Sequence, residues 1–90
     1  MTVKLIIAIL RHEDTEKVSS ALIAAQFRVT YIASSGGLLR HGLTTLMIGL
    51  NEEKVDEAID VIRNSFGPTH DPADKRATLF VMNVVHYEQL

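Results

Sequence analysis

The stretch VKLIIAIL, residues 3–10, is apolar at seven of its eight positions and rich in isoleucine. Its short length and its β-branched residues favour a strand that is buried on both faces over a helix. The four polar residues at positions 11–14 end the apolar run. The stretch therefore predicts a buried strand near the start of the domain.

Two later segments repeat apolar residues at helical spacing. From Val18 onward they recur at i, i+3, i+4 and i+7, which predicts a helix over residues 14–25. The same kind of pattern predicts a second helix over residues 51–66. We expect the side-chain oxygens of Asp14 and Asn51 to cap these helices by accepting backbone N–H groups.

Three further segments are short and rich in β-branched, aromatic or other apolar residues, which is typical of strands. They cover residues 27–33, 44–50 and 77–85. The resulting order, β-α-β-β-α-β, predicts an α+β, ferredoxin-like domain over residues 1–90. Such a domain has a four-stranded antiparallel sheet with both helices on one face.

The predicted strands do not alternate between apolar and polar residues, as strands with one solvated face do. Residues 3–10 place apolar side chains on both sides, and so do residues 46–50 and 79–84. Two helices cover only one face of the sheet, so the other face would expose an apolar surface in a single chain. Such a surface favours association, and we expect the chain to form a homo-oligomer.

Composition excludes several classes of protein. The 90 residues contain no cysteine, which excludes disulfides, cysteine-based metal sites and thiol chemistry. A net charge of −2 is too balanced for a general binder of nucleic acid or anionic membranes. The longest apolar run, residues 5–10, is far shorter than the roughly 20 residues of a membrane helix. We expect a mature, cytoplasmic protein without membrane insertion.

A candidate binding site is suggested by a few polar residues and glycines near the middle of the chain. Arg28 and Thr30 share one face of the predicted strand, an arrangement that suits a phosphate or a purine edge. Gly36 and Gly37 can present backbone N–H groups to an anion. Gly49 suggests that another backbone or a ligand approaches closely. The alternative is a solvated arginine and an ordinary glycine turn.

No catalytic or metal-binding pattern stands out. The four histidines are scattered without the spacing of metal ligands. The acidic residues between positions 52 and 60 have the character of a solvated helix face. Ser34 and Ser35 have no nearby base that would activate a nucleophile. We therefore expect neither an enzyme nor a bound metal or cofactor.

Four stretches of the sequence resemble the PII-like cyclic-di-AMP receptor family of bacterial signalling proteins. They are LIIAIL (5–10), ALIAAQFRVTYIASSGGLL (21–39), GLTTLMIGLNEEKVDEAIDVI (42–62) and ATLFVMNVVHYEQL (77–90). The set FRxT, SGG and TTxxIG is the most specific part of the resemblance. The resemblance extends from Leu5 to Ile62 and over residues 77–90, so it covers nearly the whole chain apart from residues 67–76.

The resemblance implies a homotrimer that binds cyclic di-AMP in clefts between subunits and acts on a regulated protein. The positions that match ligand contacts in the family are Gln26, Arg28, Thr30, Leu38, Leu39, Gly49 and Gln89. Arg28 would face a phosphate or a ribose, and the backbone at Gly36 and Gly37 would donate hydrogen bonds. Leu38 and Leu39 would pack against an adenine.

Three features differ from the pattern of this family. Leu43 stands where an asparagine is usual, and Leu38 replaces an expected phenylalanine. The connection at residues 67–76 is much shorter than in the family, where it helps to form the binding and output region. These differences leave a second hypothesis open, a structural or interaction protein that has lost or changed its ligand.

Overall fold

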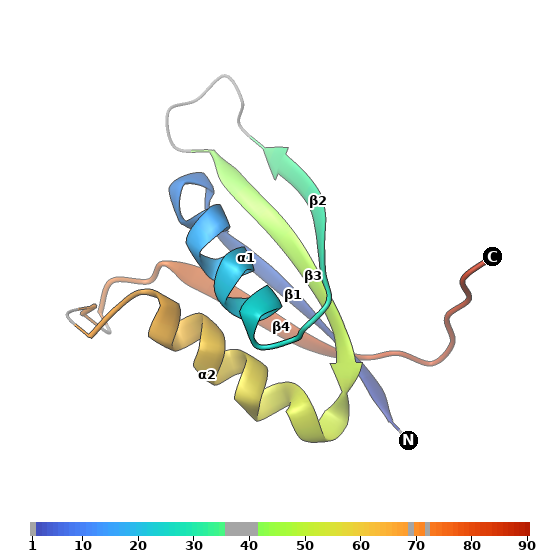
Figure 1. Cartoon of the computed structure of the whole chain (residues 1–90). Coiled ribbons are helices and arrows are strands. Elements are labelled where there is room, and N and C mark those ends of the chain that lie inside the picture. Colours follow the sequence, from blue (N-terminus) through green and yellow to red (C-terminus); the bar gives the residue numbers. More distant parts are fainter. Residues whose placement is uncertain (1, 36–41, 69, 72) are drawn as a thin grey trace.

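The computed structural model describes residues 2–35, 42–68, 70–71 and 73–90. Its elements are β1 (Val3–Arg11), α1 (Thr15–Ala24), β2 (Val29–Ser35), β3 (Leu43–Asn51), α2 (Val55–Ser65) and β4 (Ala77–Asn83). A short 3₁₀ turn leads into each helix, η1 (His12–Asp14) before α1 and η2 (Glu52–Lys54) before α2. Figure 1 shows this β-α-β-β-α-β order along the chain.

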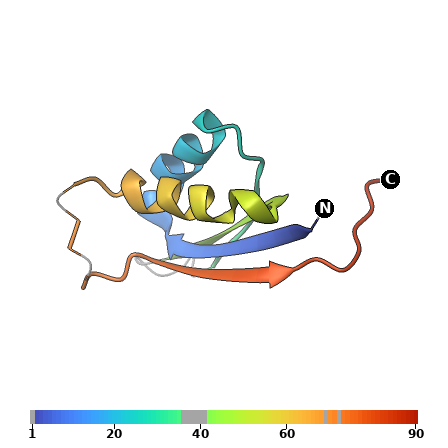
Figure 2. The same cartoon turned by 90° about the horizontal axis from the view of Figure 1, so that it is seen from below.

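The four strands form one antiparallel sheet in the order β2-β3-β1-β4. Because β1 lies between two neighbours, its residues 4–10 pair on both sides, for example Ile6 with Ile48 of β3 and with Val81 of β4. Both helices lie on the same face of this sheet (Figure 2). The α+β, ferredoxin-like prediction is therefore confirmed.

The hydrophobic core lies between the sheet and the two helices. Its buried apolar side chains are Ile6, Ala8, Leu10, Val18, Leu22, Leu46, Ile48, Leu50, Ala58 and Ile62. Within β1 and β3 these residues occupy alternate positions, as expected for side chains that share one face of a strand. The other alternate positions point to the face that no helix covers.

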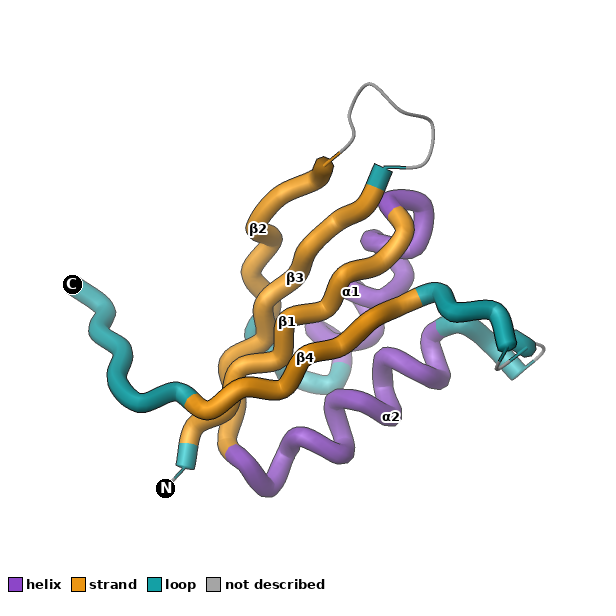
Figure 3. The backbone as a smooth tube through the Cα atoms, turned by 180° about the vertical axis from the view of Figure 1, so that it is seen from behind, coloured by secondary structure: helices purple, strands orange, loops and turns teal. Residues whose placement is uncertain are grey.

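That uncovered face is apolar, as the sequence predicted. The strand register places Ile7 beside Met47 of β3 and Phe80 of β4, and places Leu5 beside Met82 of β4. Phe80 and Met82 are 52% and 48% exposed. Figure 3 views the sheet from this side, with no helix in front of it. We call the surface formed by Leu5, Ile7, Ile9, Met47, Phe80 and Met82 the open face.

Two expected helix caps were wrong. Neither Asp14 nor Asn51 makes a side-chain hydrogen bond to the first turn of its helix. Asp14 is only 1% exposed, and its carboxylate instead accepts hydrogen bonds from Arg76, with Arg76 Nε 3.1 Å from Asp14 Oδ2 and a second bond from Nη2 to Oδ1. Asn51 is the last residue of β3. An ion pair formed with a distant residue has taken the place of a local cap.

The connection between α2 and β4 is attached to the first part of the chain. In addition to the Arg76–Asp14 pair, Arg11 Nη2 lies 3.0 Å from Asp74 Oδ1. The Arg76 guanidinium also lies 5.3 Å from the centre of the Phe66 ring at the end of α2, within the range of a cation–π contact. These contacts hold the end of this short connection beside η1 and α2.

None of the helices within the described ranges is long and apolar enough to cross a membrane.

Candidate functional site

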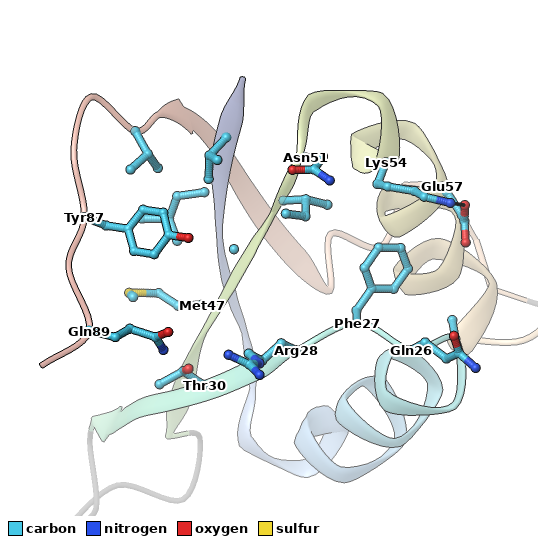
Figure 4. A pocket seen from close by; sticks show the side chains of 16 residues that line it. Gln26, Phe27, Arg28, Thr30, Met47, Asn51, Lys54, Glu57, Tyr87 and Gln89 are labelled. Carbon is cyan, nitrogen blue, oxygen red and sulfur yellow. Dashed lines mark hydrogen bonds and ion pairs between the residues drawn. The ribbon is translucent and has the colours of Figure 1, made fainter. Parts of the chain in front are cut away.

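A cavity of about 730 Å³ opens where β2 and β3 separate. The pairing of these strands starts at Val29 opposite Ile48, so residues 49–51 of β3 extend beyond it. Sixteen residues line the cavity, from the α1–β2 connection, β1, β2, β3, the start of α2 and the chain end (Figure 4). We call it the β2–β3 cavity. Its size is within the usual range of small-molecule sites, about 300–1,000 Å³.

The end of α1 shapes one wall of the cavity. Gln26 adopts a left-handed conformation with φ of 70°. Its N–H donates to Ile23 O, and the N–H of Phe27 donates to Leu22 O, each at 2.9 Å. These two bonds form a Schellman motif, which ends a helix and reverses the chain. The motif ends with Phe27, which was predicted to be the first strand residue, and β2 begins at Val29 instead.

The motif brings Phe27 against the core and leaves Arg28 exposed at the cavity. Arg28 and Thr30 lie side by side there, two positions apart (Figure 4). In the part of the chain that the structure describes, the Arg28 guanidinium has neither a hydrogen-bond acceptor nor an ion-pair partner. An arginine with free donors next to a hydroxyl can bind an anionic group such as a phosphate.

The second cation that lines the cavity is already paired. Lys54, the last residue of η2, has its Nζ 3.5 Å from Oε1 of Glu57 in the first turn of α2. Figure 4 shows this pair at the rim, beside Phe27 and away from Thr30. The side of the cavity at Arg28 is therefore the one best suited to negative charge.

The floor of the cavity is apolar and contains a glycine. Val3, Leu5 and Met47 contribute side chains to it. A Cβ atom built on Gly49 would have no heavy atom of the described residues within 4 Å, apart from residue 49 and its two chain neighbours. The missing side chain thus leaves the floor open for a ligand to approach the backbone.

The chain end forms the wall opposite the α1–β2 connection. Tyr87 and Gln89 line the cavity from there, and Figure 4 shows both side chains turned toward Met47 and Thr30. Gln89 was an expected contact residue, whereas Tyr87 was not singled out in the sequence. The one local signal that could have identified Tyr87 is its position two residues before Gln89, which places the two side chains on the same side of an extended segment.

The structure gathers five of the nine expected contact residues at one cavity, namely Gln26, Arg28, Thr30, Gly49 and Gln89. The other four, Gly36, Gly37, Leu38 and Leu39, lie outside the described residues. Met47, Asn51 and Lys54 also line the cavity and were not predicted as site residues. They are brought there by strand pairing and by the start of α2.

No group of three or more His, Cys, Asp or Glu side chains that could hold a metal ion occurs within residues 2–35, 42–68, 70–71 and 73–90.

Comparison with known proteins identifies the family. The sequence model of the cyclic-di-AMP receptor family matches residues 3–71. The chain belongs to this family. The match to the family model ends at residue 71, before Tyr87 and Gln89, so the contribution of the chain end to the cavity rests on the structure and not on this match.

Two solved structures resemble the chain over most of its length. A functionally unknown protein from Pediococcus pentosaceus is 32% identical, with a TM-score of 0.78, and the alignment covers 100% of this chain and 99% of that one. The PII protein of Arabidopsis thaliana bound to citrate is 20% identical, with a TM-score of 0.66, and the alignment covers 92% of this chain and 78% of that one. The second likeness supports the PII-like fold.

Proposed function

We propose that this member of the cyclic-di-AMP receptor family is a signal-transduction protein that binds an adenine dinucleotide, with cyclic di-AMP as the candidate, in the β2–β3 cavity. The observation that carries the proposal is the Arg28 guanidinium, which has no partner among the described residues and lies beside Thr30 in an open cavity with an apolar floor. A cyclic dinucleotide presents phosphates to such a cation and flat bases to such a floor. The protein would bind this ligand without converting it.

We further propose that the protein acts as a homotrimer with the β2–β3 cavity in the cleft between neighbouring subunits. Leu5 and Met47 belong both to the open face and to the floor of the cavity. A second copy that covers the open face would therefore adjoin the cavity. Binding of the ligand would change the conformation of the trimer, and this change would alter how the trimer interacts with a regulated protein.

Isothermal titration calorimetry of the native oligomer with cyclic di-AMP, ATP and ADP tests the proposed function. We expect saturable binding of cyclic di-AMP. A nucleotide that is already bound to the purified protein can be released by denaturation and identified by mass spectrometry. The absence of heat with all three nucleotides, in protein free of co-purified ligand, would favour a structural or interaction protein on the same scaffold. The leucines at positions 38 and 43 are the observation behind that alternative.

Arg28→Ala is expected to weaken the binding of cyclic di-AMP about 10- to 150-fold, because it removes a charge-assisted hydrogen bond. Calorimetry measures the change. Arg63→Ala is the matched control, since Arg63 is an exposed arginine on α2 that does not line the cavity. Equal affinities for the Arg28→Ala and Arg63→Ala proteins would remove Arg28 from the site.

Gly49→Val is expected to abolish nucleotide binding without loss of the fold. Valine suits a strand, and among the described residues its Cβ would meet no atom within 4 Å other than those of its own residue and its two chain neighbours. Its methyl groups would instead occupy the floor of the cavity. Thermal unfolding and light scattering should match those of the unmodified protein, while calorimetry shows no binding. Unchanged affinity would contradict the close approach of a ligand to residue 49.

A further inference from the structure

The chain end beyond β4 has little attachment to the rest of the domain. The last backbone hydrogen bond between this segment and another element, among the described residues, runs from Val84 N–H to Val3 O at 3.2 Å. Val85 and Tyr87 are 99% and 66% exposed. A tyrosine that leaves two-thirds of its surface in water, next to an apolar floor, has much apolar area that a ligand could cover.

Tyr87 and Gln89 face the β2–β3 cavity together. Residues two apart in an extended segment share one side, and both line the cavity. In Figure 4 the Tyr87 ring is turned toward the part of the cavity where Met47 lies, while Arg28 from the α1–β2 connection and Thr30 from β2 also reach into it. A flat ring placed between Tyr87 and Met47 would contact an aromatic face on one side and a thioether on the other, and both are favourable partners for it.

We propose that Tyr87 stacks on a purine ring of the bound nucleotide and that residues 84–90 close over the cavity as a strap. This inference rests on the proposed function, and it assigns the purine to the Tyr87 side of the cavity and a phosphate to the Arg28 side. The ligand class is a purine nucleotide in which base and phosphate reach opposite walls at once. Tyr87 sets specificity for the flat base, because stacking needs a face and not a particular hydrogen-bond pattern.

Intrinsic fluorescence can test the stacking directly, because the chain contains two tyrosines and no tryptophan. In a Tyr31→Phe variant, Tyr87 is the sole fluorophore. Titration with cyclic di-AMP is expected to quench it saturably. A Tyr87→Phe variant is the matched control, since it keeps only Tyr31, which lies on β2 and does not line the cavity. The fluorescence of this control should decrease only because the added nucleotide absorbs part of the excitation light.

Affinity gives the second readout. Tyr87→Phe should bind cyclic di-AMP as tightly as the unmodified protein, whereas Tyr87→Ala should bind it about 5- to 150-fold more weakly. The strap would be overturned if the Tyr87→Ala protein bound cyclic di-AMP as tightly as the unmodified protein and Tyr87 were not quenched in the Tyr31→Phe variant. The proposed function would still stand. A change in particle mass of Tyr87→Ala by light scattering would assign Tyr87 to the subunit interface and overturn the strap too. Absence of binding by the unmodified protein would overturn both proposals.

Discussion

Arg76→Met is expected to lower the free energy of unfolding by about 3–5 kcal/mol, the usual effect of removing one partner of a buried ion pair. The Asp14 carboxylate is 1% exposed and accepts two hydrogen bonds from the Arg76 guanidinium. Methionine fills a similar volume but donates no hydrogen bond, so a charged group would remain buried without its main partner. Lys17 Nζ, 3.9 Å from Asp14 Oδ1, can compensate in part, which places the expected effect toward the lower end.

Urea unfolding followed by circular dichroism measures this change. The double variant Asp14→Leu/Arg76→Met should recover part of the lost stability, because no charge is then left buried. Asp60→Ala serves as the control, since it breaks an exposed ion pair with Arg63 that is worth about 1 kcal/mol or less. A loss below 1 kcal/mol for Arg76→Met would show that Asp14 is solvated or paired elsewhere.

Phe80→Lys is expected to convert the assembled protein into monomers. Phe80 stands at the open face beside Ile7 and is half exposed in the single chain, so the domain can accept a polar residue there. In an assembly that covers the open face, the lysine ammonium would be taken out of water without a partner, which is strongly unfavourable. Light scattering should then report a particle of about 10 kDa, the mass of one chain.

Ile23→Lys provides a matched control for Phe80→Lys. Ile23 is 59% exposed but lies on α1, on the helix side of the sheet, so its variant should assemble as the unmodified protein does. Circular dichroism should show that both variants fold. If Phe80→Lys remains assembled, the interface lies elsewhere on the molecule. If the unmodified chain is already a 10 kDa particle, the open face is not covered by a second copy and the proposed inter-subunit cleft is excluded.

The order of strands and helices could be predicted from local patterns. The apolar run at residues 3–10 became β1, and the helical stripe after Val18 became α1. The start of β2 was misplaced by two residues, because Gln26 adopts a left-handed conformation that few residues other than glycine favour. A glutamine in this position gives no warning of a Schellman motif.

The binding residues could be predicted only where they follow one another in the chain. Arg28 and Thr30 were found through their spacing along a strand. Met47 and Tyr87 were not, because Met47 reaches the cavity through its pairing with Thr30 and Tyr87 through the path of the chain end. The expected cap at Asp14 failed for a similar reason, since its partner Arg76 lies 62 positions away.

Hydrophobic patterning was sufficient to establish the sequence of elements and the apolar character of both sheet faces. These properties depend on the periodicity and the transfer free energy of each residue, which can be read from the chain itself. The β2–β3 cavity depends instead on where two strands stop pairing, and the burial of Asp14 depends on a distant arginine. Both arise from contacts between segments far apart in sequence, so they became visible only once the chain was folded.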